Sequence, residues 1–111
     1  MSLKSDQARL EFIVLLIKDI EIIIARHGDV EKTLDDIEGR YAILMCCQQI
    51  GETLYKIECE TIKNQLPVHA AYSMRNIITH DYLGINPKII AGIITNDLPD
   101  LKTKISCILE K

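Results

Sequence analysis

The sequence predicts an all-α fold, an antiparallel bundle of four to five helices forming a single domain over residues 1–111. Long segments repeat apolar residues at helical spacing, and no segment shows the alternation that is typical of a half-buried strand. Almost half of the residues are apolar but only 5% are aromatic, so Ile and Leu must fill the core. The length is sufficient for one hydrophobic core, because domains usually contain about 100–150 residues.

The first predicted helix covers residues 5–27 and ends at Gly28. Its apolar residues recur every three or four positions, at Leu10, Ile13, Ile17, Ile20 and Ile24. Further apolar residues, among them Phe12, Leu15 and Ile22, occupy other faces of this helix. The apolar surface is therefore wider than the stripe of about 100° that one core requires. We expect the second apolar face to be covered by a partner chain.

An acidic stretch, residues 29–38, leads into a second predicted helix that ends near residue 60. Gly51 lies in the interior of this helix, where it costs about 1 kcal/mol relative to Ala. Either another backbone approaches closely at this position, or the glycine is simply tolerated.

Proline and capping residues divide the C-terminal half into shorter helices. Pro67 fits the first position of a third helix over residues 68–80, because its missing amide is not needed there. A break follows at residues 81–84. Asn86, followed by Pro87, starts a short helix that runs through residue 94, and Asp97 starts a last helix.

Charge and hydropathy limit the possible partners of the chain. Residues 1–60 carry a formal charge of −5 and residues 61–111 a charge of +2, so a phosphate-bearing partner would prefer the C-terminal half. No apolar run approaches the roughly 18 residues of a membrane span, which predicts a soluble, cytoplasmic protein without membrane contact. The four cysteines lack metal-binding or redox spacing, and we expect them to be buried.

Residues 75–82 combine the side chains that handle phosphate and protons. Arg75 offers a planar fork of donors to phosphoryl oxygens, His80 can exchange a proton near neutral pH, and Tyr82 carries a hydroxyl group. On a regular helix His80 is rotated by about 140° from Arg75, so the three side chains converge only if the helix ends near His80. Alternatively, Arg75 only pairs with Asp81 and His80 only caps the helix.

Cleavage of RNA without a metal requires a base for the 2′-OH proton, an acid for the departing 5′-oxygen and a cation for the phosphorane. The motif of one chain supplies one histidine. Two copies of the third helix meeting across a two-fold axis would place two His80 and two Arg75 in one cleft. We therefore expect a homodimer, and we expect His27 and His69 to be structural.

The segment Arg75-Asn76-Ile77-Ile78-Thr79-His80-Asp81-Tyr82 resembles the R-x4-6-H-x-Y signature of the HEPN superfamily, in its HepT-like toxin branch. The segments Ile50-Gly51-Glu52, Leu83-Gly84-Ile85-Asn86-Pro87 and Asn96-Asp97-Leu98-Pro99-Asp100-Leu101 also resemble that branch. The resemblance implies a HEPN-like homodimeric ribonuclease that acts on RNA, the toxin of a toxin–antitoxin pair. Its antitoxin would be a nucleotidyltransferase of the MNT type.

By this resemblance Arg75 and His80 are the catalytic residues, and Asn76 and Asp81 support them. Tyr82 is the acceptor of an AMP group that the antitoxin transfers from ATP, so the chain itself uses no cofactor or metal. An added phosphodiester beside Arg75 would occupy the cation needed for RNA. Two other functions stay open, a non-catalytic helical adaptor of a nucleotidyltransferase and a nucleotide-binding module without cleavage.

Overall fold

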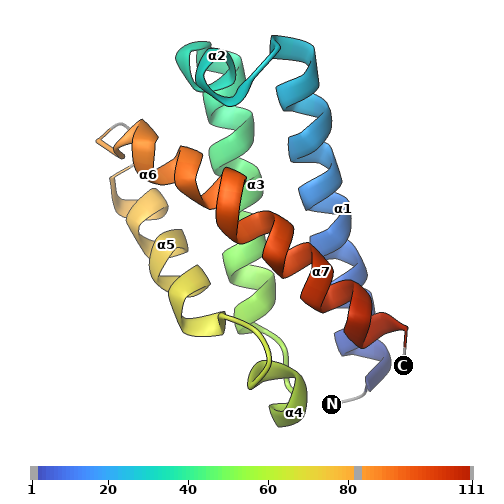
Figure 1. Cartoon of the computed structure of the whole chain (residues 1–111). Helices are drawn as coiled ribbons and strands as arrows, with labels where there is room; N and C mark the ends of the chain where they lie inside the picture. The colour runs from blue at the N-terminus through green and yellow to red at the C-terminus, as the bar shows by residue number, and fades with distance from the viewer. Residues whose placement is uncertain (1–2, 82–83, 111) are drawn as a thin grey trace.

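The computed structural model describes residues 3–81 and 84–110, and these residues form helices joined by short connections (Figure 1). The helices, in chain order, are α1 (Leu3–His27), α2 (Val30–Asp35), α3 (Ile37–Tyr55), α4 (Glu60–Lys63), α5 (Val68–His80), α6 (Pro87–Gly92), the π-helical turn η1 (Ile93–Asp97) and α7 (Leu98–Leu109). No strand occurs in this part of the chain. The prediction of an all-α fold is confirmed.

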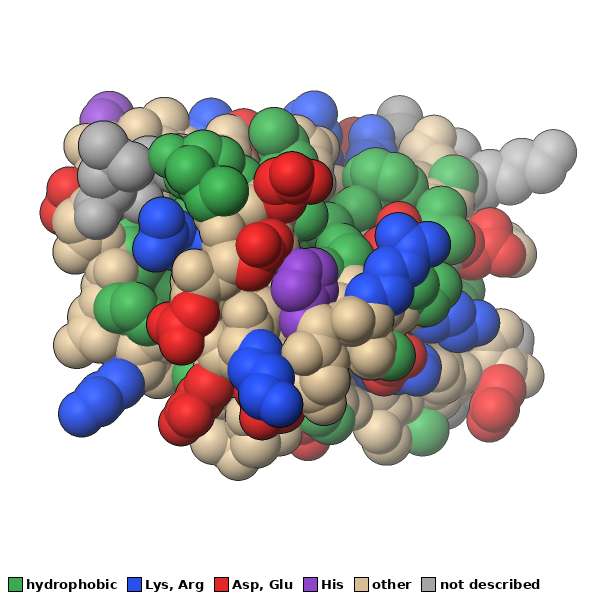
Figure 2. Space-filling view, turned by 90° about the horizontal axis from the view of Figure 1, so that it is seen from above, with side chains coloured by type: hydrophobic (Ala, Val, Ile, Leu, Met, Phe, Trp, Pro, Cys, Tyr) green, Lys and Arg blue, Asp and Glu red, His purple; other side chains and the backbone are tan. Residues whose placement is uncertain are grey.

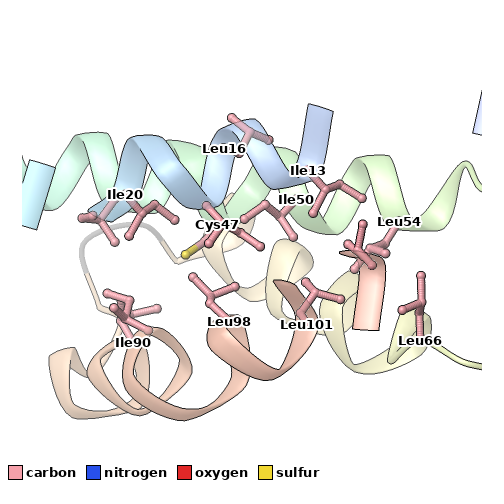
Figure 3. Close-up of a cluster of buried hydrophobic side chains, with 14 of the residues drawn as sticks. Ile13, Leu16, Ile20, Cys47, Ile50, Leu54, Leu66, Ile90, Leu98 and Leu101 are labelled. Atoms are coloured by element: carbon pink, nitrogen blue, oxygen red, sulfur yellow. The ribbon is translucent and has the colours of Figure 1, made fainter. Parts of the chain in front are cut away.

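The two long helices α1 and α3 lie side by side and antiparallel, and the shorter helices pack around them (Figure 1). Helix α5 packs along α3, while α7 crosses both long helices obliquely and contacts α1. Ile90, Leu98 and Leu101 of α6 and α7 lie opposite apolar side chains of α1 and α3 (Figure 3). Ile and Leu dominate this core, as the composition predicted.

The second helix is shorter than predicted. Helix α3 ends at Tyr55 instead of near residue 60, and the acidic stretch before it contains the short helix α2, whose N-cap Asp29 accepts a hydrogen bond from the Lys32 amide at 2.8 Å. The chain leaves the helix because the amides of Glu58 and Cys59 donate to Asp6 of α1 instead of to carbonyl groups of α3.

The last two predicted helices are joined. Asp97 does not begin a new helix with a side-chain cap: it has helical backbone angles, and the chain continues from α6 through η1 into α7. The Leu98 amide donates to the Ile93 carbonyl, the wide turn of a π-helix. Pro99 lies directly after this turn and supplies no amide donor. The predicted cap of α6 is confirmed, because Asn86 accepts from the Lys88 amide at 2.9 Å.

The cysteines differ in exposure. Cys47 is buried, Cys46 and Cys59 are partly buried, and Cys107 is exposed, so the expectation of burial is wrong for Cys107. Burial raises the pKa of the Cys47 thiol to about 12, which makes this thiol unreactive. In the described part of the chain, no helix has the length and hydropathy to cross a membrane.

His27 joins the end of α1 to the start of α3. Its Nδ1 donates to the Ile23 carbonyl at 2.8 Å, and its Nε2 lies 3.2 Å from Oδ2 of Asp36, the N-cap of α3. The hydrogen bond to Ile23, followed by the Asp36 carboxylate, raises the pKa of His27. Gly28 takes a φ of +106° to end the helix, which favours glycine. These contacts agree with the structural role expected for His27.

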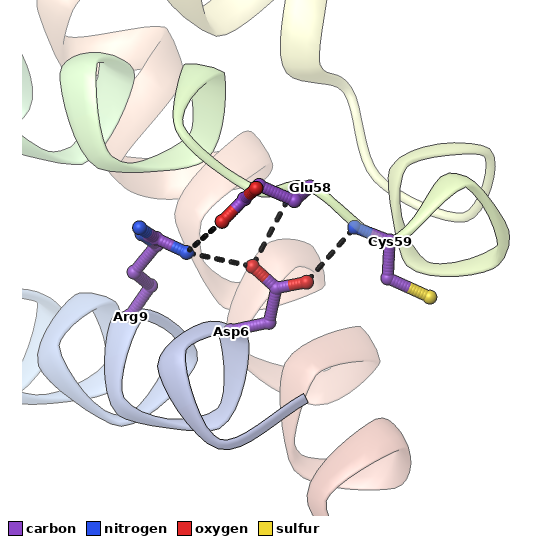
Figure 4. A network of polar contacts seen from close by, with 4 residues as sticks. All are labelled: Asp6, Arg9, Glu58 and Cys59. Atoms are coloured by element: carbon purple, nitrogen blue, oxygen red, sulfur yellow. Dashed lines mark hydrogen bonds and ion pairs between the residues drawn. The ribbon is translucent and has the colours of Figure 1, made fainter. Parts of the chain in front are cut away.

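Asp6 is a fully buried carboxylate that ties α1 to the connection between α3 and α4 (Figure 4). It accepts hydrogen bonds from the Glu58 amide at 3.0 Å, the Cys59 amide at 2.9 Å and Arg9 Nη1 at 2.9 Å. Burial by itself raises the pKa of Asp6, but the two amides and the Arg9 guanidinium outweigh it and lower the pKa below its ordinary value. The ionised carboxylate therefore stabilises the folded state.

We predict that Asp6→Ala lowers the free energy of unfolding by roughly 2–4 kcal/mol at pH 7, because it leaves two buried amides without an acceptor. Asp6→Asn keeps one acceptor and should cost less. Since the pKa of Asp6 is lower in the folded protein, its contribution is complete above about pH 4 and is lost as the pH falls further.

Urea denaturation, followed by circular dichroism from pH 7 to pH 3, measures the difference in free energy of unfolding between the wild type and Asp6→Asn. It should shrink below about pH 4. Asp35→Asn, at an exposed carboxylate, is the control and should change little. A difference that is the same at every pH would contradict the assigned role of the Asp6 charge.

Candidate functional site

Helix α5 carries the motif residues and has the predicted boundaries, Val68–His80. Ile78 is fully buried and fixes the rotation of the helix against the core. The Asp81 amide donates to the Ile77 carbonyl and closes the helix, and Pro67 is the N-cap instead of the first helical residue. His80 is therefore the last residue of α5, as the convergence of the motif requires.

The backbones of α3 and α5 approach closely at Gly51. A Cβ atom at this position would lie 2.6 Å from the Ala71 carbonyl oxygen and 2.8 Å from the Arg75 Cβ. Both distances are shorter than atoms tolerate, so only glycine fits. Of the two alternatives left open for Gly51, the close approach of another backbone is the one found, and it brings Arg75 against the following residue of α3, Glu52.

Arg75 is half-buried and held by a network of hydrogen bonds. Its Nε and Nη2 donate to Glu52 Oε1 at 2.9 and 2.7 Å, and its Nη1 donates to Asn76 Oδ1 at 2.9 Å. The alternative partner considered for Arg75 was Asp81, but the carboxylate that binds it is Glu52. The supporting role expected for Asn76 has a geometric basis in this contact.

Two tyrosines complete the surroundings of Arg75. The guanidinium carbon of Arg75 lies over the Tyr72 ring, 5.5 Å from its centroid. Tyr72 in turn stacks on Tyr55 of α3, with centroids 4.0 Å apart and an angle of 19° between the ring planes. Neither tyrosine was identified from the sequence, because their contact depends on the register between α3 and α5.

The remaining motif residues lie at the end of α5. His80 and Asp81 are exposed, and Thr79 Oγ1 donates to the Arg75 carbonyl at 2.9 Å. Tyr82, the expected AMP acceptor, lies outside the described residues. His69, expected to be structural, is exposed near the start of the same helix. Convergence of Arg75, His80 and Tyr82 thus stays a prediction. The structure places Arg75 and His80 on one helix, with His80 as its last residue and Arg75 five residues earlier.

Several large apolar side chains are exposed on the two long helices. On α1 they are Phe12, Leu15 and Ile22, with 42–54% of their surface accessible, and on α3 they include Ile37 and Met45. The second apolar face that the sequence predicted for α1 is therefore present. A partner chain that covers this face stays a prediction.

The charges at the α2 end of the bundle are mixed. Figure 2 shows this face with acidic and basic side chains interspersed and no large patch of one sign. A broad basic surface of the kind that binds nucleic acid without specificity is not seen here. Among the described residues, no three His, Cys, Asp or Glu side chains are grouped so that they could hold a metal ion.

A family model described as "Ribonuclease HepT-like" matches residues 15–108. The matched span contains both Arg75 and His80, and it confirms the resemblance and the HEPN-like fold inferred from the motif. Searches of curated proteins and of solved structures found no match.

Gly51→Ala should separate α3 from α5, because the added Cβ collides with backbone and with Arg75. We predict a loss of about 1–3 kcal/mol in the free energy of unfolding, the usual cost of overpacking. The matched control is Gly92→Ala, since nothing lies within 4 Å of a Cβ at that helical position. This control should be stabilising by up to about 1 kcal/mol. Equal stability of the two variants in urea would contradict the close approach.

Proposed function

The chain belongs to the ribonuclease HepT-like family, and we propose that it is the ribonuclease toxin of a toxin–antitoxin pair, with a composite active site formed by a homodimer. The observation that carries this proposal is the arrangement on α5, where Arg75 is held in a fixed orientation and His80 ends the same helix. An RNA-cutting toxin acts where cellular RNA lies, so its location is the cytoplasm.

Arg75 is suited to hold the scissile phosphate. A guanidinium has five N–H groups, and three of them are used by Glu52 and Asn76. The two that are left, one on Nη1 and one on Nη2, are able to donate to two phosphoryl oxygens. Glu52 thus orients the Arg75 guanidinium and offsets part of its positive charge. The bidentate contact of the guanidinium with the phosphate stabilises the negative charge of the phosphorane.

Two His80 side chains would divide the proton transfers. One imidazole takes the proton of the ribose 2′-OH, and the 2′-oxygen attacks phosphorus. The bond from phosphorus to the 5′-oxygen breaks, and the other imidazole, in its protonated form, gives a proton to that oxygen. The products are a 2′,3′-cyclic phosphate and a free 5′-OH, and no metal takes part.

The homodimer is required because the motif of one chain supplies one histidine. A two-fold axis beside α5 would bring both motifs to one cleft. The exposed apolar side chains of α1 and α3, such as Phe12, Leu15 and Met45, supply surface for such an association.

The antitoxin of this proposal is an MNT-type nucleotidyltransferase that modifies Tyr82. The phenolic oxygen attacks the α-phosphorus of ATP, pyrophosphate leaves, and the phenol loses its proton. Because Tyr82 follows His80 by two positions, the attached AMP would lie beside the site and its phosphate would compete for Arg75. ATP is a substrate of the antitoxin, so the toxin needs no cofactor.

The alternative function is a non-catalytic helical adaptor of a nucleotidyltransferase. The exposed apolar side chains of α1 and the charge of −5 on residues 1–60 favour it, since both suit contacts with protein. The third candidate, a nucleotide-binding module, would use Arg75 and His80 for binding alone. Only assays of RNA cleavage separate these functions.

We predict that His80→Ala lowers the rate of RNA cleavage about 10²–10⁴-fold, the usual contribution of a general acid or base. Arg75→Lys keeps the charge but loses the planar fork, and it should also lower the rate. His80 is exposed, so His80→Ala should leave the melting temperature and the dimer unchanged.

Purified variants and a fluorogenic oligoribonucleotide suffice for this measurement. Lys88→Ala, at an exposed cation of α6, is the control and should cleave like the wild type. Undiminished cleavage by His80→Ala would remove the proposed role of His80, and an inactive wild type would favour the adaptor.

Incubation with ATP and the nucleotidyltransferase should add AMP to the chain and abolish cleavage. Intact-mass analysis with peptide mapping should locate the AMP at Tyr82. Tyr82→Phe should prevent both the mass increase and the inhibition, whereas Tyr41→Phe should prevent neither. Labelling of Tyr82→Phe to the same extent would refute the assigned acceptor.

A further inference from the structure

Tyr55 and Tyr72 form an aromatic stack directly beside Arg75. The Tyr72 ring is covered by Tyr55 at 4.0 Å and also contacts the Arg75 guanidinium. Tyr72 is partly buried, but 54% of the surface of Tyr55 is accessible although one face of its ring is covered. An aromatic face is thus presented to solvent, and the Tyr72 ring separates it from the cation that we assign to the scissile phosphate.

A groove continues from Tyr55 away from the motif. It has a volume of about 870 Å³, within the range of about 300–1,000 Å³ that is typical of ligand sites. The groove runs between the end of α3, helix α4 and the start of α5, and its lining includes Tyr55, Lys56, Lys63 and His69. His69 precedes Tyr72 by one turn of α5, as Tyr72 precedes Arg75.

The charges around this groove leave cations available to a phosphate. Two carboxylates line it, but Glu58 pairs with Arg9 at 3.5 Å and Glu60 pairs with Lys63 at 3.2 Å. Lys56 forms no ion pair with the described residues and is exposed, as is His69. Both side chains carry donors suited to phosphoryl oxygens.

We propose that Tyr55 is the stacking platform for a base of single-stranded RNA, on the strand whose scissile phosphate Arg75 holds, and that the groove beyond Tyr55 receives a further nucleotide of that strand. This inference rests on the proposed ribonuclease function and names a substrate-binding subsite for it. Aromatic rings are the usual platforms for unstacked bases in proteins that bind single strands. Tyr72 holds the Tyr55 ring in place before RNA arrives, so little side-chain freedom is lost on binding.

The subsite also specifies which RNA fits. A base that stacks on Tyr55 must be unpaired, so the substrate is a single strand or a loop and not a regular duplex. Every base has an aromatic face, so the platform tolerates different sequences. Tyr55 and Tyr72 act on substrate position and affinity, and they take no part in proton transfer.

Tryptophan fluorescence tests this subsite, because the chain contains no tryptophan. Tyr55→Trp, combined with His80→Ala to prevent cleavage, places a single fluorophore at the platform. Titration with an adenylate hexanucleotide should quench its fluorescence, and linear polyphosphate, which has charge but no bases, should not. Tyr41→Trp in the same background is the matched control on α3 and should show no quenching.

Cleavage kinetics of variants with an intact His80 give the second readout. Tyr55→Ala should raise KM about ten- to hundredfold, the usual effect of losing one base stack. Its kcat should change little. Tyr55→Trp should keep KM near the wild-type value, because indole also stacks on bases. A structural role of Tyr55 would instead lower the melting temperature and affect both variants.

Failure of the subsite and failure of the proposed function give different results. If the wild type cleaves RNA but Tyr55→Ala has an unchanged KM and Tyr55→Trp is not quenched, the subsite is wrong and the ribonuclease stands. If Tyr55→Ala weakens the dimer without changing RNA affinity, Tyr55 is an interface residue and the inference is overturned. If the wild type neither binds nor cleaves RNA, both proposals are wrong. Quenching without cleavage by the wild type would show that a base stacks at Tyr55 and would overturn its assignment as the subsite of a ribonuclease.

Discussion

The close approach of α3 and α5 at Gly51 is the constraint on which the site depends. Glycine allows the Ala71 carbonyl and the Arg75 Cβ to come within 2.6 and 2.8 Å of the place where a side chain would begin. At this separation Glu52 reaches the Arg75 guanidinium, and Tyr55 reaches Tyr72 one turn further along α3. A wider spacing would break both contacts together, so orientation of the cation and formation of the aromatic stack share one physical cause.

The sequence predicted those parts of the fold that local chemistry determines. The boundaries of α5 followed from a proline before it and the break at residues 81–84, and the cap of α6 followed from Asn86. The predicted end of the second helix was wrong because the end of α3 depends on a hydrogen bond to Asp6, which lies 52 positions before Glu58 in the sequence. The start of the last helix after Asp97 was predicted, but its continuity with α6 was not, since a capping residue type does not reveal that a π-helical turn joins the two helices.

The candidate site likewise contains residues that the sequence revealed and contacts that depend on how distant segments pack. Arg75 and His80 lie on one helix, so their types and spacing were visible in the sequence. The partners of Arg75 were not derivable, because Glu52 and Tyr72 meet it only when α3 and α5 have their observed register. Glu52 did appear in the segment that resembles the HepT-like branch. The available signal for its contact was Gly51, which indicated a close approach of some other backbone but did not identify that backbone as α5.

The charge of the chain determines how such a site would have to bind RNA. A protein with a net charge of −3 releases few counterions from RNA, so general attraction to the phosphate backbone contributes little affinity. Glu52 lowers that attraction further, because it accepts two of the hydrogen bonds of Arg75. The contact with Glu52 thus fixes the orientation of the Arg75 guanidinium but offsets its positive charge. Affinity must then come from contacts that do not depend on charge, which assigns to the exposed ring of Tyr55 a role that a strongly basic protein would not need.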